Sequence, residues 1–406
     1  MRDFKFQISN FKFQRPSLKL SAAAARCALR AARCILLAFI CLLPSTAYCS
    51  LLTAHSAEGG WAKQKSGTLA WLHAVYFVNE RRGWAVGGKG ALLATEDGGA
   101  HWEVRRAPVE DTLNDIFFTD ERTGWVVCER SIYLLKTKDE RRSYLLKTED
   151  GGASWRRVEV AGTDVDARLV RVRFAGRERG WVFGEMGALY ATTDGGGSWA
   201  RQRVPTRHLL LGGMFLDARQ GWLVGAGATL LQTSDSGETW RAGRLVTGQP
   251  LSLPLNPAPA SYPLASSSSP ASARAASAEP ESAAPRSSAG APSVVRFNAV
   301  SFVDGRRGWA VGGGGAVFAT EDGGLTWRAQ SSNVSADLLD VKFFDAREGL
   351  AVGGDGTAIH TSDGGATWRS EPTGTPHTLE RLFFAGRERG WAVGFGGTII
   401  AFERRG

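Results

Sequence analysis

The chain has 406 residues, of which 43% are apolar, with 50 glycines and 14 tryptophans, a composition that suits an all-β protein with many glycine turns. The formal net charge of +9 would suit a nucleic-acid-binding protein, but residues 1–49 carry eight lysines and arginines against one acid. Removing the +7 of that segment leaves +2 for the rest, which argues against nucleic acid as a partner. Beyond the segment Cys128 is the only cysteine, so it forms no disulfide there and no cysteine-based metal site.

Residues 1–50 have the pattern of a targeting segment. A basic stretch leads into the apolar run Ile35–Leu43, which is followed by Pro44 and small residues. Nine apolar residues are too few to cross a bilayer as a helix but fit a signal peptide, with cleavage expected after Ala47 or Cys49. An uncleaved anchor or a misplaced start codon is the alternative, because the basic stretch is unusually long. The pattern predicts an exported protein, periplasmic or lumenal, that can associate with the membrane.

From residue 59 onward the sequence repeats, with a period of 41 residues in most units. In each unit a phenylalanine ends an alternating apolar run, and seven residues later a tryptophan follows a glycine, with leucine in one unit. The phenylalanines are Phe77, Phe118, Phe174, Phe215, Phe302, Phe343 and Phe384, and their partners are Trp84, Trp125, Trp181, Trp222, Trp309, Leu350 and Trp391. Period-two alternation with glycine and aspartate at the turns predicts four short antiparallel strands per unit. The sequence therefore predicts an all-β fold, a seven-bladed β-propeller over residues 59–406.

The last unit, Leu382–Arg405, ends after three strands, and its missing strand is expected at the start of the repeat. Trp61 lies 16 residues before Phe77, the same spacing that separates Trp102 from Phe118 in the next unit. The segment Gly60–Lys65 is therefore in register as a fourth strand without a blade of its own. We expect it to complete the C-terminal blade and close the ring, which removes the open edges of a linear array.

Two insertions interrupt the period. In the second unit YLLKTKDERRS, at Tyr133–Ser143, is followed at once by YLLKTEDGG. One copy is expected in the third strand and the other in a loop whose charged middle, Lys138–Arg142, is solvated. Residues 247–293 are rich in proline, alanine and serine, which predicts a disordered insertion between the fourth and fifth blades. A linker between two domains is the weaker alternative, because both parts would keep open edges.

Six copies of one octapeptide mark the third turn of the units, as in TEDGGLTW at Thr320–Trp327. They match the Asp box, or bacterial neuraminidase repeat, S/T-x-D-x-G-x-S/T-W, with His101 as the only departure. Sialidases carry such boxes, which raises glycan hydrolysis as a hypothesis. However, a turn residue repeated in blade after blade cannot be catalytic in every copy, so the aspartates are expected to be structural residues of hairpins. They are Asp97, Asp150, Asp194, Asp235, Asp322 and Asp363.

Other candidate chemistry is weak. A sialidase needs an arginine cluster for the substrate carboxylate and a tyrosine nucleophile with an acidic partner, and no singular Tyr–Glu arrangement stands out. The glycine runs, such as Gly312–Gly315, lack the Gly-Lys-Ser/Thr of a phosphate loop and lie between strands, so they predict hairpin turns. The six histidines show no metal-ligand spacing. We therefore expect no catalytic residue, no metal and no cofactor.

The turn between the first and second strands contains an arginine in all seven units, and it is expected on the same face as the Asp box. One interpretation is that each arginine pairs with a neighbouring acid or stacks on a tryptophan. The functional interpretation is a ring of guanidinium groups that binds an acidic protein segment. The variable loops of the opposite face also suit binding. The candidate protein-binding residues are Arg81, Arg122, Arg179, Arg219, Arg306, Arg347 and Arg389.

The full unit, clearest in Phe302–Trp327, resembles the photosystem II stability/assembly factor family, seven-bladed propellers of the thylakoid lumen and bacterial periplasm. The resemblance covers nearly all of Gly59–Phe402. It implies a non-enzymatic assembly factor that binds an immature membrane-protein subunit, with surface arginines implicated. Relatives also occur in bacteria without photosystems. The insertion and the duplicated strand depart from the compact pattern of the family.

Two hypotheses follow. The leading one is an exported, monomeric binding scaffold without enzymatic activity, which assists the assembly or stability of a membrane protein complex. The alternative is a glycan-binding or glycan-hydrolysing, sialidase-like propeller. Its structural sign would be a pocket lined by paired carboxylates about 5–10 Å apart.

Overall fold

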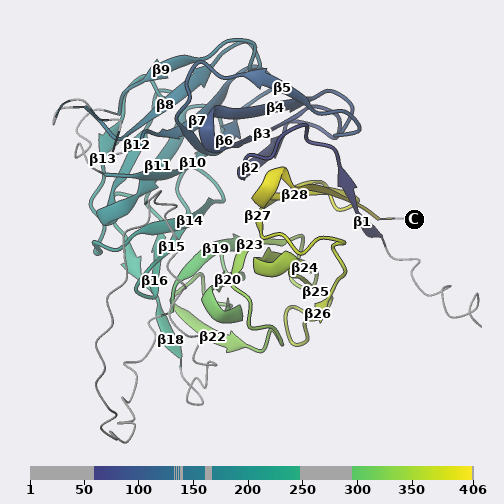
Figure 1. Ribbon diagram of the computed structural model, residues 1–406. Helices are drawn as coiled ribbons and strands as arrows, with labels where there is room; N and C mark the ends of the chain where they lie inside the picture. Colours follow the sequence, from purple (N-terminus) through teal and green to yellow (C-terminus); the bar gives the residue numbers. More distant parts are fainter. Residues whose placement is uncertain are drawn as a thin grey trace, which may run out of the picture. The chain divides into compact units, whose positions relative to one another are not determined.

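The computed structural model describes residues 59–131, 133, 135, 137, 140–160, 167–246 and 295–404. These residues form seven sheets that follow one another along the chain, drawn from purple to yellow in Figure 1. They are the blades of a β-propeller, which confirms the predicted fold. The predicted signal peptide and the insertion at 247–293 lie outside the described residues. Within the described ranges, no helix is long and apolar enough to cross a bilayer.

The strands of each blade pair in chain order from the centre of the propeller outward. The first blade contains β2 (Leu72–Phe77), β3 (Gly83–Gly87), β4 (Ala91–Thr95) and β5 (Glu103–Arg106). The second contains β6 (Thr112–Phe118), β7 (Gly124–Glu129), β8 (Ser143–Thr148) and β9 (Arg156–Val158). The third contains β10 (Leu169–Ala175), β11 (Arg179–Gly184), β12 (Leu189–Thr192) and β13 (Ala200–Arg201).

The remaining blades repeat this order. The fourth contains β14 (Leu210–Phe215), β15 (Gly221–Gly225), β16 (Thr229–Thr233) and β17 (Arg241–Ala242). The fifth contains β19 (Phe297–Phe302), β20 (Gly308–Gly312), β21 (Val317–Thr320) and β22 (Thr326–Gln330). The sixth contains β23 (Leu338–Phe343), β24 (Gly349–Gly353), β25 (Ala358–Thr361) and β26 (Arg369–Ser370). The seventh contains β27 (Leu379–Ala385), β28 (Arg389–Gly394), β29 (Ile399–Glu403) and β1 (Gly60–Gln64).

The second strand of each blade is apolar on both faces, as in GWAVG of β20, in which all five residues are buried. Both faces of this strand are covered by neighbouring blades, so continuous hydrophobicity replaces the alternation of a half-exposed strand. The outermost strands are exposed, as in β5, where none of the four residues is buried. The core therefore lies between the blades.

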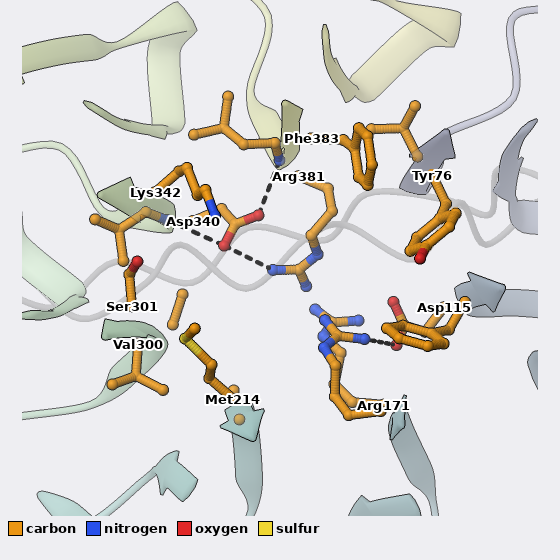
Figure 2. A pocket seen from close by; sticks show the side chains of 18 of the residues that line it. Tyr76, Asp115, Arg171, Met214, Val300, Ser301, Asp340, Lys342, Arg381 and Phe383 are labelled. Atoms are coloured by element: carbon orange, nitrogen blue, oxygen red, sulfur yellow. Dashed lines mark hydrogen bonds and ion pairs between the residues drawn. The ribbon is translucent and has the colours of Figure 1, made fainter. Parts of the chain in front are cut away.

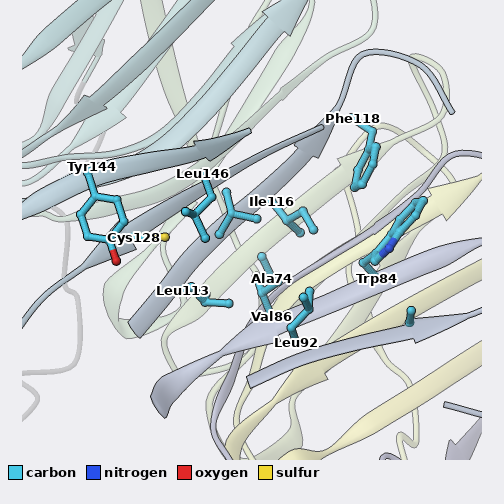
Figure 3. Close-up of a cluster of buried hydrophobic side chains, with 12 residues drawn as sticks. Ala74, Trp84, Val86, Leu92, Leu113, Ile116, Phe118, Cys128, Tyr144 and Leu146 are labelled. Carbon is cyan, nitrogen blue, oxygen red and sulfur yellow. The ribbon is translucent and has the colours of Figure 1, made fainter. Parts of the chain in front are cut away.

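One aromatic arrangement recurs at the contacts between blades. Trp309 of β20 stacks on Phe343 of the next blade, with 3.6 Å between ring centroids, and the Asp-box Trp368 meets the same phenylalanine edge-on at 5.8 Å. Figure 3 shows the equivalent contact between the first two blades, in which Trp84 stacks on Phe118 at 3.9 Å among buried aliphatic side chains. The phenylalanine and the tryptophan that stand seven residues apart therefore place one aromatic ring on each face of a blade.

Glycine precedes these tryptophans because the phenylalanine of the same blade occupies the space beside it. A Cβ atom added at Gly308 would lie 2.5 Å from the ring of Phe302, closer than real Cβ contacts. This close approach explains the Gly-Trp pair of the repeat.

The N-terminal strand closes the propeller as predicted. β1 pairs antiparallel with β29, with Trp61 opposite Phe402. The Trp61 indole lies 5.3 Å from the ring of Phe402 and meets Phe384 edge-on at 6.4 Å. It therefore takes the position that the Asp-box tryptophan has in the other blades.

A strand that the sequence did not reveal lies directly before the second insertion. β18 (Arg244–Val246) pairs in parallel with β22 and gives the fifth blade a fifth strand. Leu245 packs against the buried cluster of that blade. The strand that leads into the insertion therefore covers a sheet edge that would otherwise be open.

The duplicated segment behaves as predicted at its second copy, which forms β8 (SYLLKT). The expectation that the charged middle of the first copy is solvated was wrong for its described part. Arg142 donates to Glu129 at 2.6 Å, and Glu140 pairs with Arg130 at 3.1 Å, all four side chains being half-buried. These ion pairs hold the end of the first copy against the second blade.

The glycine runs are hairpin turns, as predicted. In η4 (Gly313–Gly315) the middle residue has φ of 63°, and Lys89 and Asp355 adopt the same left-handed conformation in η1 (Gly88–Gly90) and η5 (Gly354–Gly356). Each run joins the second strand of a blade to the third.

Candidate functional site

In the first six blades the arginine turn and the Asp box lie side by side on one face of the propeller. The backbone N–H of Gly98 donates to the carbonyl of Arg81 at 2.7 Å, and Gly323 donates to Arg306 at 2.8 Å. Equivalent bonds occur in blades two, three, four and six. The two turns therefore form one hydrogen-bonded rim, which we call the turn face.

Each Asp-box carboxylate accepts bonds inside its own hairpin. Asp322 Oδ1 accepts from the Thr326 N–H at 2.9 Å and from Thr320 Oγ1 at 2.8 Å, and Oδ2 accepts from Thr326 Oγ1 at 2.6 Å. In the first blade His101, the departure from the motif, supplies its ring nitrogen to Asp97 at 2.7 Å in place of a hydroxyl. These bonds engage both oxygens of each carboxylate, and the geometry agrees with a structural role.

The same bonds keep the Asp boxes ionised. The hydroxyl of Ser154 and its backbone N–H hold the pKa of Asp150 at about 2, and Thr239 and Thr367 do the same for Asp235 and Asp363. A carboxylate with so low a pKa is a poor proton donor at neutral pH.

The candidate arginines of the turn face fall into two structural classes. Five occupy the third position of turns that begin with Asn or Asp, whose side-chain oxygen accepts the arginine N–H, as between Asp304 and Arg306 at 2.8 Å. The five side chains are exposed and lie one to a blade. They are Arg81, Arg122, Arg219, Arg306 and Arg347.

The other two predicted arginines lie in blade–blade contacts instead. Arg389 lies over the Trp391 ring at 5.4 Å and donates to the carbonyl of Gly98 in the next blade at 3.4 Å. Arg179 lies over Trp181 at 5.6 Å and donates to Ser236 at 2.8 Å. Both side chains are half-buried, so they do not belong to the exposed ring that the sequence predicted.

In those two turns, Gly-Arg-Glu-Arg, the exposed arginine is the first one. Arg177 pairs with Asp120 of the preceding blade at 3.2 Å, and Arg387 pairs with Asp345 at 2.8 Å. The Arg177 side chain is nevertheless 76% exposed. With these replacements every blade presents at least one exposed arginine on the turn face. The fifth blade also exposes Arg307, which pairs with Asp304 of its own turn at 2.7 Å. We call the set with one arginine from each blade, without Arg307, the arginine ring. Its members are Arg81, Arg122, Arg177, Arg219, Arg306, Arg347 and Arg387.

A second candidate site, which the sequence reasoning missed, lies in the central channel. The innermost strands of all seven blades line a cavity of about 360 Å³. Figure 2 shows Arg171 and Arg381 pointing into it from opposite sides, with Asp115, Asp340 and Lys342 around them. The available signal was the occurrence of charged residues in otherwise apolar strands, as in VRVRF of β10.

The channel carboxylates are held by neighbouring strands. Asp115 accepts from the Arg173 guanidinium at 2.6 Å and from the Val172 N–H at 3.0 Å. Asp340 accepts from the N–H groups of Leu382 and Val341 at 2.8 and 3.0 Å. Burial nevertheless raises the pKa of Asp340 to about 6.

A larger cavity, of about 560 Å³, lies where the glycine turns and inter-blade loops meet. Three acids line it, together with Trp71. Two of them are already engaged: Asp337 lies 3.5 Å from Arg296 and accepts from the Gly314 N–H at 2.8 Å, and Glu380 lies 2.9 Å from His73. Asp355 is the third. In the described part of the chain, no three His, Cys, Asp or Glu residues gather closely enough to hold a metal ion.

A protein-family model described as Photosynthesis system II assembly factor YCF48 matches residues 53–144, 107–208, 288–358 and 329–403. Among solved structures, the chain is similar to one of YCF48 bound to D1 peptide, with 18% identity over 86% of this chain and 99% of that one, and a TM-score of 0.61. It is also similar to YCF48 from Cyanidioschyzon merolae, with 20% identity, coverage of 85% and 99%, and a TM-score of 0.61.

The chain also resembles the GH74 xyloglucanase from Xanthomonas campestris, with 13% identity over 86% of this chain and 54% of that one, and a TM-score of 0.56. No curated protein sequence matches it significantly. At identities of 20% and below, these structures establish the propeller fold and nothing finer.

Proposed function

Since the chain belongs to the family of the Photosynthesis system II assembly factor YCF48, we propose that it is a non-enzymatic scaffold that binds a segment of a membrane-protein subunit during assembly of its complex. The observation that carries the proposal is the arginine ring, with at least one exposed arginine from every blade on a single face. A similar structure holds YCF48 bound to a D1 peptide, which supports peptide binding by a propeller of this kind.

The arginine ring is displayed on a rigid backbone. Each of its Asx turns is held by a side-chain oxygen and by a bond to the adjacent Asp box, as at Arg81, whose N–H donates to Asn79 at 3.0 Å and whose carbonyl accepts from Gly98. Binding of a partner therefore costs little conformational entropy in the backbone of this face. Guanidinium groups form paired hydrogen bonds with carboxylates, so the ring favours an acidic segment.

Four members of the ring have partners that position their side chains. Arg177 and Arg387 form ion pairs with the preceding blade, and Arg122 and Arg306 donate to backbone carbonyls. The Nε atoms of Arg122 and Arg306 donate to the carbonyls of Glu149 and Glu321 at 3.3 Å, both in the Asp turn of the same blade. These bonds leave the terminal nitrogens of the guanidinium groups for a partner.

Export to the periplasm or lumen, with peripheral association to the membrane, is part of the proposal and rests on the signal-peptide pattern of residues 1–50. A monomeric state is supported by the closure of the ring and by outer strands as short as two residues, which offer little edge for a second copy.

Affinity purification from the membrane fraction tests the proposal. The wild-type chain is compared with a variant in which Arg81, Arg219 and Arg306 are changed to Glu. A matched control carries the same three charge reversals at Lys65, Arg241 and Arg328, which are exposed but do not belong to the arginine ring. We expect wild type and control to retrieve the same membrane-protein subunit and the ring variant to lose it. If the ring variant still retrieves the subunit, the arginine ring is excluded as the binding site. If the wild type retrieves no specific subunit, the scaffold function is excluded.

Glycan hydrolysis is the second candidate, favoured by the likeness to a xyloglucanase and by Trp71 beside the acids of the larger cavity. It is weaker because two of those acids are ion-paired or hydrogen-bonded, and both oxygens of the Asp-box carboxylates accept hydrogen bonds within their own hairpins. Turnover of a sialoside or β-glucan by the purified chain, abolished by Asp355→Asn, would overturn the non-enzymatic assignment.

A further inference from the structure

The central channel holds an excess of buried positive charge. Four cationic side chains line the smaller cavity, against the two carboxylates of Asp115 and Asp340. The cations are Arg171, Arg173, Lys342 and Arg381. Charged groups removed from water normally occur with compensating partners, because burial of an uncompensated charge is costly. Two positive charges lack such a partner among the residues that line this cavity.

Arg171 and Arg381 have donors left over. Their exposed fractions are 6% and 5%. One terminal nitrogen of Arg171 donates to the carbonyls of Asn114 at 3.1 Å and Val170 at 3.3 Å, and one of Arg381 donates to the carbonyl of Leu339 at 3.5 Å. The Nε atoms of both arginines are buried without a hydrogen-bond partner among the described residues. Burial of a donor without an acceptor costs free energy, so an acceptor inside the channel would stabilise both arginines.

The nearby carboxylates cannot satisfy both arginines. Asp115 is engaged by Arg173 and a backbone N–H, and Asp340 accepts two backbone N–H groups and lies 3.7 Å from Arg381. Glu380, which precedes Arg381 in β27, lines the larger cavity instead and is paired with His73. Burial also lowers the pKa of Lys342.

We propose that the channel binds a small polyvalent oxyanion, of the class of phosphate, sulfate or a short dicarboxylate, through Arg171, Arg381 and Lys342. Such an anion would supply the acceptors that the two arginines lack and neutralise both excess charges. The planar guanidinium groups suit oxyanions, and Figure 2 shows them converging from β10 and β27. The cavity volume of about 360 Å³ lies within the range of small-molecule pockets, and Met214, Val300 and Phe383 form an apolar wall around it.

This site is separate from the proposed function. It lies inside the ring of innermost strands, whereas the arginine ring lies on the turn face, and no member of the arginine ring lines the cavity. Loss of one kind of binding therefore leaves the other measurable.

Calorimetric titration and thermal unfolding of the full-length chain test the proposal. The probes are sodium phosphate, sodium sulfate and sodium succinate at constant ionic strength, with sodium chloride as the reference. We expect one anion per chain and a rise in melting temperature beyond that in chloride. Phosphate or sulfate as the stronger ligand would indicate an inorganic tetrahedral anion, and succinate a small carboxylate.

The variants Lys342→Met and Arg381→Gln remove single contacts, and Arg241→Gln on the exposed outer strand β17 is the matched control. We expect at least a tenfold loss of affinity in the two channel variants and none in the control. If Arg381→Gln fails to fold, Lys342→Met carries the test, because it replaces the charge with an apolar chain of similar length. The absence of binding at one anion per chain, or equal stabilisation of wild type and Lys342→Met by every probe, would overturn the proposal.

Discussion

The indole of Trp391 in the last blade stacks on the ring of Phe77 in the first, with 3.6 Å between centroids and 14° between planes. The distance equals that between Trp309 and Phe343, which belong to consecutive blades. The ring is therefore closed by the same contact that joins its interior blades, in addition to the pairing of β1 with β29.

Replacement of Trp61 should weaken this closure. Trp61→Ala removes contacts with Phe384 and Phe402, and we expect the free energy of unfolding to fall by about 2 kcal/mol, less than for a fully buried tryptophan because the indole is half-exposed. Urea unfolding followed by circular dichroism measures the change. Lys63→Ala, at an exposed position of the same strand, is the control and should stay within about 0.5 kcal/mol of wild type. Equal stability of the two variants would show that the strand adds nothing to closure.

The two classes of turn arginine should differ in their effect on stability. Arg389→Met removes a bond to Gly98 of the next blade and a cation–π contact with Trp391, so we expect a loss of about 1–2 kcal/mol. Arg347→Met removes an exposed side chain and should change stability by less than about 0.5 kcal/mol. Denaturant titration of both variants measures their free energies of unfolding. A larger loss of stability for Arg347→Met than for Arg389→Met would contradict the division into two classes.

Removal of an Asp-box carboxylate should destabilise the hairpin that contains it. Asp322→Ala leaves the Thr326 N–H and two hydroxyl groups without their acceptor, at a cost of about 1–3 kcal/mol. Glu321→Ala changes the exposed neighbour in the same turn and serves as the control. If calorimetric melting showed the two variants equally stable, the structural role of the box would be refuted.

The channel should make stability depend on pH through Asp340. Burial raises its pKa to about 6 in the folded chain, so the folded state binds a proton that the unfolded state has released. The stabilisation is complete below the ordinary aspartate pKa of about 3.9 and is lost as pH rises through about 6, by up to about 3 kcal/mol. Relative to wild type, Asp340→Asn should therefore gain stability between pH 4 and 6. Urea unfolding at pH 4, 5, 6 and 7 tests this, with Glu321→Gln as the control that should keep the wild-type slope.

The sequence predicted the architecture well because the blade is a local pattern. The spacing from Phe302 to Trp309 and on to Trp327 is set within one unit, and repetition reveals the number of blades. The closure by Trp61 could be predicted because its spacing to Phe77 matched the other units.

Other features depend on geometry that spacing does not contain. Gly-Arg-Glu-Arg offers two arginines, and the turn that begins at Gly176, with φ of 78°, exposes Arg177 and directs Arg179 to the next blade. The channel was missed because Arg171 and Arg381 become neighbours only when the ring closes. The pairing of β18 with β22 joins segments on either side of residues 247–294, so no local pattern indicates it.

The pairing of β1 with β29 also has a consequence for the order of folding. During synthesis β29 follows every other strand of the ring, so β1 has no partner until almost the whole propeller has been made. The two strands of the closing pair lie at opposite ends of the ring sequence, so their pairing raises the contact order. Because this pairing closes a loop of the whole ring, it has a large entropy cost and comes late in folding. Until β1 and β29 have paired, β29 presents an open edge. During this interval the edge is most exposed to pairing with a strand of another copy of the chain.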